Sequence, residues 1–157
     1  MAALRDVVAF ICQNHPNPNE LSKARLTKLV YLADWKMCLD VDHQMTETQW
    51  YFNHYGPYVP DVEQLARNDP AFFVEQTSNY YGGLKEIIRN VEYIQPQLNE
   101  NERGVLKFCI ENTKNLSWDD FIKLIYSTYP IVTESRFEYL NLPALAYDYK
   151  RSETYLG

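Results

Sequence analysis

The sequence is poor in basic residues, in glycine and in cysteine, and it contains no long apolar run. Its 157 residues include 15 Lys and Arg against 21 Asp and Glu, which gives a formal net charge of -6. Proteins that bind phosphate backbones usually carry a basic surface, so this balance disfavours nucleic acid as a partner and favours a basic protein. Because no apolar run is long enough to cross a membrane as a helix, we expect no membrane association.

Cysteine usage excludes two kinds of stabilising site. Cys12, Cys38 and Cys109 are odd in number and far apart, with no Cys-x-x-Cys pair. This spacing predicts neither a disulfide framework nor a zinc site. Free thiols suit a reducing compartment, and the first residues lack the features of a secretory signal, so we expect a cytoplasmic protein.

The residue types that support catalysis are not gathered into any known motif. The five glycines form no glycine-rich phosphate loop. The histidines stand apart at His15, His43 and His54, without partners at metal-ligand spacing. We therefore expect no catalytic residue, no metal site and no cofactor, and we expect the protein not to be an enzyme. The enzyme alternative would require a deep polar pocket near His54.

What the sequence does contain is enough apolar material for one core, together with many aromatic residues. Hydrophobic residues make up 46% of the chain and aromatic residues 15%, with 13 tyrosines. A chain of this length fits one ordinary domain. Tyrosine buries an apolar ring and keeps a hydroxyl for a partner, so a cluster of tyrosines would indicate an interface, whereas a single one is more often a core residue.

Apolar residues at helical spacing predict two N-terminal helices. The first covers residues 4–12 and stops before the turn-rich residues 16–19. The second is capped by Ser22 and carries an apolar stripe as far as Met37. Its basic residues are offset by acidic neighbours, so we expect a solvated face. These charged residues are Lys23, Arg25, Lys28 and Lys36, with Glu20, Asp34 and Asp40.

The middle of the chain changes to a β-rich pattern. Residues 46–54 place Thr48, Trp50 and Phe52 on one face, which predicts a strand. The turn that follows ends this strand, and Pro60 then begins a short helix.

A hairpin is predicted next along the chain. Residues 72–77 and 84–89 flank a glycine-bearing turn at residues 78–83, although the second arm could also be helical. From Asn99 the chain returns to helix, with a capping-box pattern formed by Asn99 and Glu102.

The last predicted helix is capped by Ser117 and ends at Tyr129-Pro130. Residues 144–157 mix tyrosine with charged residues and show no periodicity, so we expect a partly ordered tail. The sequence thus divides into a domain of residues 1–143 and a tail of residues 144–157.

Together these patterns predict an α+β, mainly α fold, namely a helical domain with a small antiparallel β-hairpin or sheet. A winged-helix DNA-binding transcriptional regulator also runs helices into a β-hairpin and is the alternative. Only one helix separates the first strand from the hairpin here, and the hairpin is not notably basic, so we rank this alternative second.

Two motifs resemble the Panacea domain, also called the SocA-like antitoxin domain. Residues 26–34 read Leu-Thr-Lys-Leu-Val-Tyr-Leu-Ala-Asp and are similar to the lysine-leucine-leucine-tyrosine helix of that family. Trp50, followed by the Tyr-Gly-Pro-Tyr-Val-Pro run of residues 55–60, looks like the family's second signature. The resemblance covers about residues 4–140. Ile131 departs from the family pattern, in which an aromatic residue often follows the proline of the closing helix.

The resemblance implies an antitoxin of a toxin–antitoxin system, associated with phage defence, that neutralises a toxin encoded by an adjacent gene through direct protein–protein binding. Delivery of the toxin to a protease is a variant, with residues 144–157 as the handle. We expect aromatic anchors on the binding surface. Its candidate residues are Tyr31, Trp35, Tyr55, Gly56, Pro57 and Tyr58. Packing and turn formation would equally account for several of these residues, and the sequence gives no sign of the oligomeric state.

Overall fold

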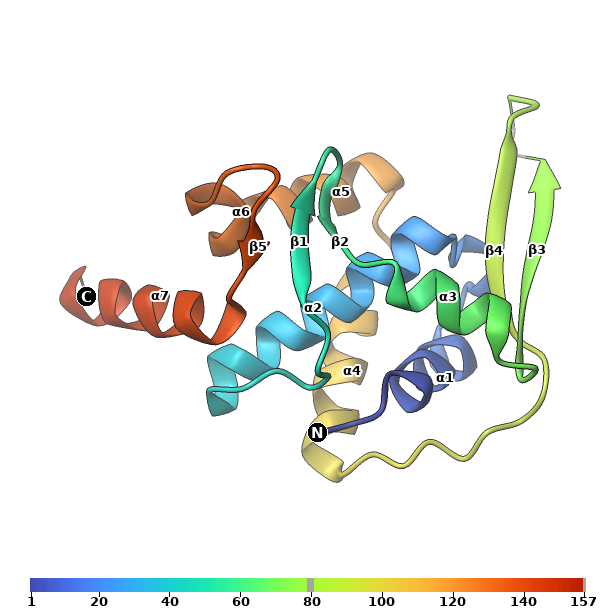
Figure 1. The fold of residues 1–157 in the computed structure, drawn as a ribbon, viewed down its shortest axis with the longest axis horizontal. Coiled ribbons are helices and arrows are strands. Elements are labelled where there is room, and N and C mark those ends of the chain that lie inside the picture. Colours follow the sequence, from blue (N-terminus) through green and yellow to red (C-terminus); the bar gives the residue numbers. More distant parts are fainter. Residues whose placement is uncertain (79–80, 157) are drawn as a thin grey trace.

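The structure, a computed structural model, describes residues 1–78 and 81–156. It confirms the predicted α+β, mainly α class, with two small antiparallel sheets among the helices (Figure 1). The helices are α1 Leu4–Asn14, α2 Lys23–Val41, α3 Asp61–Asn68, α4 Glu100–Thr113, α5 Trp118–Ser127, α6 Tyr129–Thr133 and α7 Leu142–Leu156, with a 3-10 turn at Pro18–Glu20. The strands are β1 Trp50–Asn53, β2 Gly56–Tyr58, β3 Phe72–Ser78, β4 Leu84–Asn90 and β5 Tyr139–Leu140.

Helix α2 runs through the middle of the molecule, and α1, α4 and α7 all pack against it (Figure 1). Its start follows the prediction, because the Ser22 side chain accepts a hydrogen bond of 3.1 Å from the backbone N–H of Arg25. It ends at Val41, and the cap residue Asp42 adopts the left-handed conformation. The elements around α2 cover nearly its whole circumference, so even charged residues on it are buried.

The first sheet has the strand order β2-β1-β5, with antiparallel pairing throughout. The predicted strand at residues 46–54 begins only at Trp50, because Thr46 forms hydrogen bonds with Asp34 instead of with a neighbouring strand. The alternation is nevertheless confirmed, since Thr48, Trp50 and Phe52 are all buried. Strand β5 comes from a segment far along the chain that the sequence pattern did not predict.

The second sheet is the predicted hairpin. Strands β3 and β4 pair from Phe72 with Asn90 to Ser78 with Leu84, so the second arm is a strand and not a helix. Two residues of the predicted turn, Asn79 and Tyr80, lie outside the described residues. The hairpin packs beside α1 and α3 (Figure 1).

The capping predictions for the C-terminal helices are confirmed. Asn99 and Glu102 form both halves of a capping box at α4, and the Ser117 side chain caps α5. The predicted end of the last helix is also correct, since α5 ends at Ser127 and Pro130 lies in the first turn of the short helix α6. Helix α6 itself was not predicted.

The predicted partly ordered tail is a helix. Residues 144–156 belong to α7, which packs against α2 and α6. Leu145 and Ala146 are buried against the core, and the ring of Tyr149 meets that of Trp35 edge-on at 6.2 Å. The chain therefore continues its core beyond residue 143, because side chains of α7 cover a part of α2 that would otherwise be exposed.

Replacing Leu145 with alanine should lower the free energy of unfolding by about 2 to 3 kcal/mol, because loss of the buried side chain leaves a cavity beneath α7. Tyr147→Ala, at an exposed position of the same helix, should change it by less than about 0.5 kcal/mol. Urea unfolding of the two variants measures both values. Equal effects would mean that α7 is not part of the folded core.

Candidate partner-binding surface

The β1-β2 turn presents part of the predicted binding motif to solvent. Asn53 and Gly56 form the closing pair of the hairpin, and Gly56 has a φ of +102°, which disfavours any side chain at this position. Tyr55 is 82% exposed at the tip, and Tyr58 is 39% exposed. Gly56 and Pro57 are buried, so their role is to shape the turn.

Two of the six predicted residues lie in the core and are removed from the candidate surface. Tyr31 is fully buried, shares a 2.8 Å hydrogen bond with the hydroxyl of Thr128, and meets the ring of Trp50 edge-on at 5.5 Å. Trp35 is buried beneath Tyr149 of α7. Both side chains face inward because α2 is covered on the side that the sequence pattern left open.

The sequence pattern missed two aromatic residues that line the same depression as Tyr58. Phe137 and Tyr139 are 53% and 72% exposed, and Tyr139 pairs across the sheet with Tyr51, their ring centres 5.1 Å apart. A sequence signal for strand β5 was available, namely the alternating side-chain pattern of Phe137, Glu138, Tyr139 and Leu140. We name Tyr51, Tyr58, Phe137 and Tyr139 the aromatic surface.

Backbone strain accompanies this arrangement at one position. Phe137 adopts a φ of +68°, which is rare for a bulky residue. The conformation is held by hydrogen bonds on both sides, from Phe137 N–H to Phe52 C=O at 2.6 Å and from Phe52 N–H to Glu138 C=O at 2.9 Å. Such strain persists where the surroundings fix it, and it clusters at functional positions.

The aromatic surface lines an open depression on the outer face of the sheet β2-β1-β5. Acidic residues also line it, and none of its lining residues is Lys, Arg or His. These carboxylates belong to Glu47, Asp61 and Glu138. The depression therefore combines aromatic rings with a negative potential, which suits a basic counterpart.

A buried carboxylate holds the sheet on α2. Asp34 is fully buried and accepts hydrogen bonds from the Trp50 indole N–H at 2.8 Å, the Thr46 backbone N–H at 2.8 Å and the Thr46 hydroxyl at 2.7 Å. Burial outweighs these hydrogen bonds and raises the pKa of Asp34 from 3.8 to about 6. The charge pattern of α2 predicted a solvated face for Asp34, which is wrong.

Two basic residues expected on the same solvated face are also buried. Arg25 donates hydrogen bonds to the carbonyl oxygens of Thr113 and Leu116 at 2.9 and 3.0 Å, and its guanidinium lies 4.6 Å from the ring centre of Phe121. Lys28 is 5% exposed and lies beside the β1-β2 hairpin. The pattern of charges did not reveal that Arg25 and Lys28 are buried, because the elements that cover them come from distant parts of the chain.

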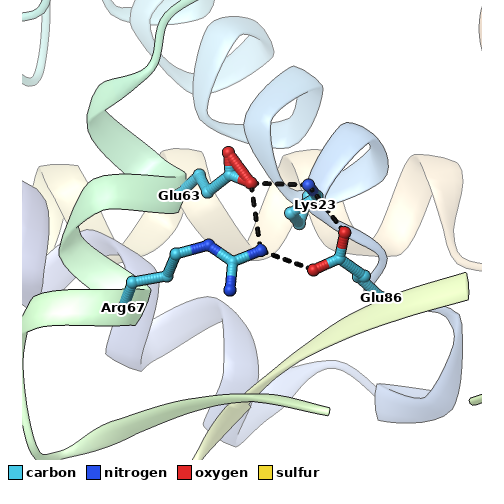
Figure 2. Close-up of polar contacts among 4 residues, drawn as sticks. All are labelled: Lys23, Glu63, Arg67 and Glu86. Carbon is cyan, nitrogen blue, oxygen red and sulfur yellow. Dashed lines mark hydrogen bonds and ion pairs between the residues drawn. The ribbon is translucent and has the colours of Figure 1, made fainter. Parts of the chain in front are cut away.

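A four-residue ion-pair network lies next to Lys28. Lys23 of α2 pairs with Glu63 of α3 at 2.5 Å and with Glu86 of β4 at 3.0 Å, and Arg67 of α3 contacts the same two carboxylates (Figure 2). The pairing lowers the pKa of Glu63 and Glu86 below their ordinary values. The network thus joins three elements, and its two cations and two carboxylates satisfy one another.

Within the described residues, no group of three or more His, Cys, Asp or Glu side chains could hold a metal ion. Burial raises the pKa of all three thiols to about 12, so none of them is a thiolate nucleophile near neutral pH. His54 is exposed at the hairpin turn, where its ring meets Phe137 edge-on at 4.9 Å. Across the part of the chain that the structure describes, no helix is both long and apolar enough to cross a membrane.

The fold and this surface define a mainly helical α+β domain whose most distinctive exposed feature is aromatic and acidic. Comparison with known families identifies it further. The family model described as "Antitoxin SocA-like, Panacea domain" matches residues 26–130, more than half of the chain, and the protein belongs to this family. Its general role is therefore antitoxin-like. Neither the curated proteins nor the solved structures include a match.

Ionisation of Asp34 should lower the stability of the folded protein as the pH rises. The folded-state pKa of about 6 exceeds the ordinary value of 3.8, so between these values the folded protein binds more protons than the unfolded chain. Ionisation therefore removes about 3 kcal/mol of stability from wild type by pH 7, and the stability lost on Asp34→Asn should be largest at pH 4 and shrink as the pH rises.

Urea unfolding of wild type and Asp34→Asn at pH 4, 5, 6 and 7 measures this difference. Asp40→Asn, at the surface of the same helix, serves as the control and should not reproduce the trend. A difference between wild type and Asp34→Asn that stays constant across the range would contradict a titration of Asp34 in this window.

Proposed function

We propose that this protein neutralises a cognate protein toxin by binding it directly through the aromatic surface. The observation that carries the proposal is the exposed cluster of Tyr58, Phe137 and Tyr139, assembled on one sheet face from segments about 80 residues apart. Exposed apolar clusters rimmed by polar residues are a common feature of interaction sites. The family's antitoxin description supports the choice of a toxin as the partner.

Aromatic side chains suit this role for a physical reason. Tyrosine and phenylalanine offer large contact areas and lose little conformational entropy on binding, so a few of them can supply most of the binding energy. The carboxylates of Glu47, Asp61 and Glu138 would steer a basic toxin toward the surface. We therefore expect a toxin whose contact area combines apolar groups with Lys or Arg.

Direct inhibition is preferred to delivery of the toxin to a protease. The delivery variant relied on a loose handle at residues 144–157, whereas residues 144–156 are helical in α7. Deleting this segment would disturb the core, so a truncated protein would not separate binding from delivery. The cytoplasm remains the proposed location, in keeping with three free cysteines.

DNA binding is the less favoured alternative. The basic residues that would have to meet phosphates are held by carboxylates, since Lys23 and Arg67 contact Glu63 and Glu86. On the hairpin, Arg89 pairs with Glu75 at 2.7 Å. Binding to phosphates would require these ion pairs to break.

Co-expression with the products of adjacent genes, followed by a pull-down and a growth assay, tests the proposal. Wild type should form a stable complex with a toxic neighbour and restore growth. The double variant Tyr58→Ala with Tyr139→Ala should weaken the complex by about 100-fold or more, because two exposed aromatic anchors are removed. Tyr93→Ala, an exposed tyrosine outside the sheet, is the matched control and should bind as wild type does.

The possible outcomes distinguish an error in the proposed function from an error in the proposed binding surface. If wild type neither binds a neighbour nor restores growth, the antitoxin proposal is wrong, and a gel-shift assay at physiological salt then tests DNA binding. If wild type restores growth but the double variant binds equally well while remaining folded, the toxin uses another face. Thermal unfolding of each variant checks that the fold is intact.

A further inference from the structure

A small pocket lies under the β1-β2 hairpin, where the hairpin meets α2 and α3. Its volume is about 260 Å³, and its walls include Thr27 and Lys28 of α2, Asn53, Tyr55 and Tyr58 of the hairpin, and Glu63 of α3. Ligand pockets for cofactors and drug-sized molecules are usually about 300 to 1,000 Å³. This pocket is therefore of a size for one side chain or a small fragment.

Lys28 is the unusual group in this pocket. Its side chain is buried, yet no described residue forms a hydrogen bond or ion pair with it. Burial alone lowers the pKa of Lys28 to about 8, with no carboxylate acting to raise it. Most of the Lys28 population therefore still carries a positive charge at neutral pH. Its ammonium group still meets solvent through the pocket, so a partner that covers the pocket must supply a counter-ion or leave the charge buried and unpaired.

The neighbouring charges cannot serve as its partner. Glu63 lines the same pocket, but its carboxylate is already held by Lys23 and Arg67 in the ion-pair network (Figure 2). Arg25, the other buried cation of α2, has no carboxylate partner either, and its Nε is buried without a hydrogen bond, but its Nη2 donates to two backbone carbonyl groups. Lys28 is thus a cation whose counter-ion the described part of the chain does not provide.

The pocket chemistry favours a carboxylate over other anions. One ammonium group matches the single charge of a carboxylate, and the lining residues Thr27, Tyr55 and Tyr58 carry hydroxyl groups that can act as donors. A phosphate group carries nearly two charges and would meet only one unpaired cation, with Glu63 at the wall. The small volume and the aromatic mouth suit an amino-acid side chain better than a free metabolite.

We propose that the Lys28 pocket receives the carboxylate of an Asp or Glu side chain of the toxin. That the carboxylate comes from the toxin rests on the proposed function, whereas the capacity of the pocket to bind a carboxylate does not. On binding, the carboxylate would pair with Lys28 in a space from which the partner excludes water, so this contact would be strong and specific.

The first arm of the test uses the free protein and sodium acetate as the probe. NMR of 15N-lysine-labelled protein reports the titration of Lys28, whose resonance is assigned by its loss in Lys28→Met. A carboxylate bound with a Kd of about 50 mM would raise the pKa of Lys28 by about one unit in 0.5 M acetate, compared with chloride at equal ionic strength. No difference between acetate and chloride would overturn the carboxylate site, whatever the toxin does.

The second arm measures toxin affinity with Lys28→Met. Methionine has a similar length and removes a buried charge, so the variant should be at least as stable as wild type while binding the toxin 30-fold or more weakly. Lys36→Met on the same helix, where Lys36 pairs with Asp40 at the surface, is the matched control and should bind as wild type does.

The two arms together decide the proposal. If acetate acts on Lys28 but Lys28→Met keeps full toxin affinity, the pocket serves a small carboxylate and the toxin side chain is the wrong occupant. If the wild-type protein binds no neighbouring gene product, the proposed function is wrong, and so is the toxin as the source of the carboxylate. The acetate arm still decides whether the pocket binds carboxylates.

Discussion

The buried carboxylate of Asp34 connects the central helix to the sheet that carries the candidate surface. Its hydrogen bonds to Thr46 and Trp50 fix the segment leading into β1 and the first residue of that strand. Trp50 in turn packs edge-on against Tyr31 of α2. Strand β1 then pairs with both β2 and β5, so this anchor positions the strand against which both edge strands of the sheet pair.

The anchor also determines which residues face outward. Side chains alternate along a strand, so a shift of one residue would turn Trp50 and Phe52 to solvent and Tyr51 to the core. A buried carboxylate costs stability, but it accepts the indole N–H of Trp50 in only one register. The fold thus gives up some stability at Asp34 and gains a fixed arrangement of Tyr51, Tyr58 and Tyr139.

Local patterns predicted the parts of the fold that depend on local chemistry. Caps such as Ser22 and Ser117 act within one helical turn, so the residues themselves reveal them. The errors all involve distant contacts. Asp34 and Lys28 were assigned to a solvated face because their covering elements, β1 and β2, follow later in the chain. Likewise, α7 shows little periodicity of its own, and its order comes from packing on α2.

The pocket and the aromatic surface are adjacent. Asn53 and Tyr58 line both the open depression and the Lys28 pocket, so one partner can contact both. The depression is acidic, whereas the pocket holds an unpaired ammonium group. A partner that satisfies both must present basic groups and, a short distance away, one protruding carboxylate. This reversal of charge would select among basic proteins more strongly than the negative potential alone.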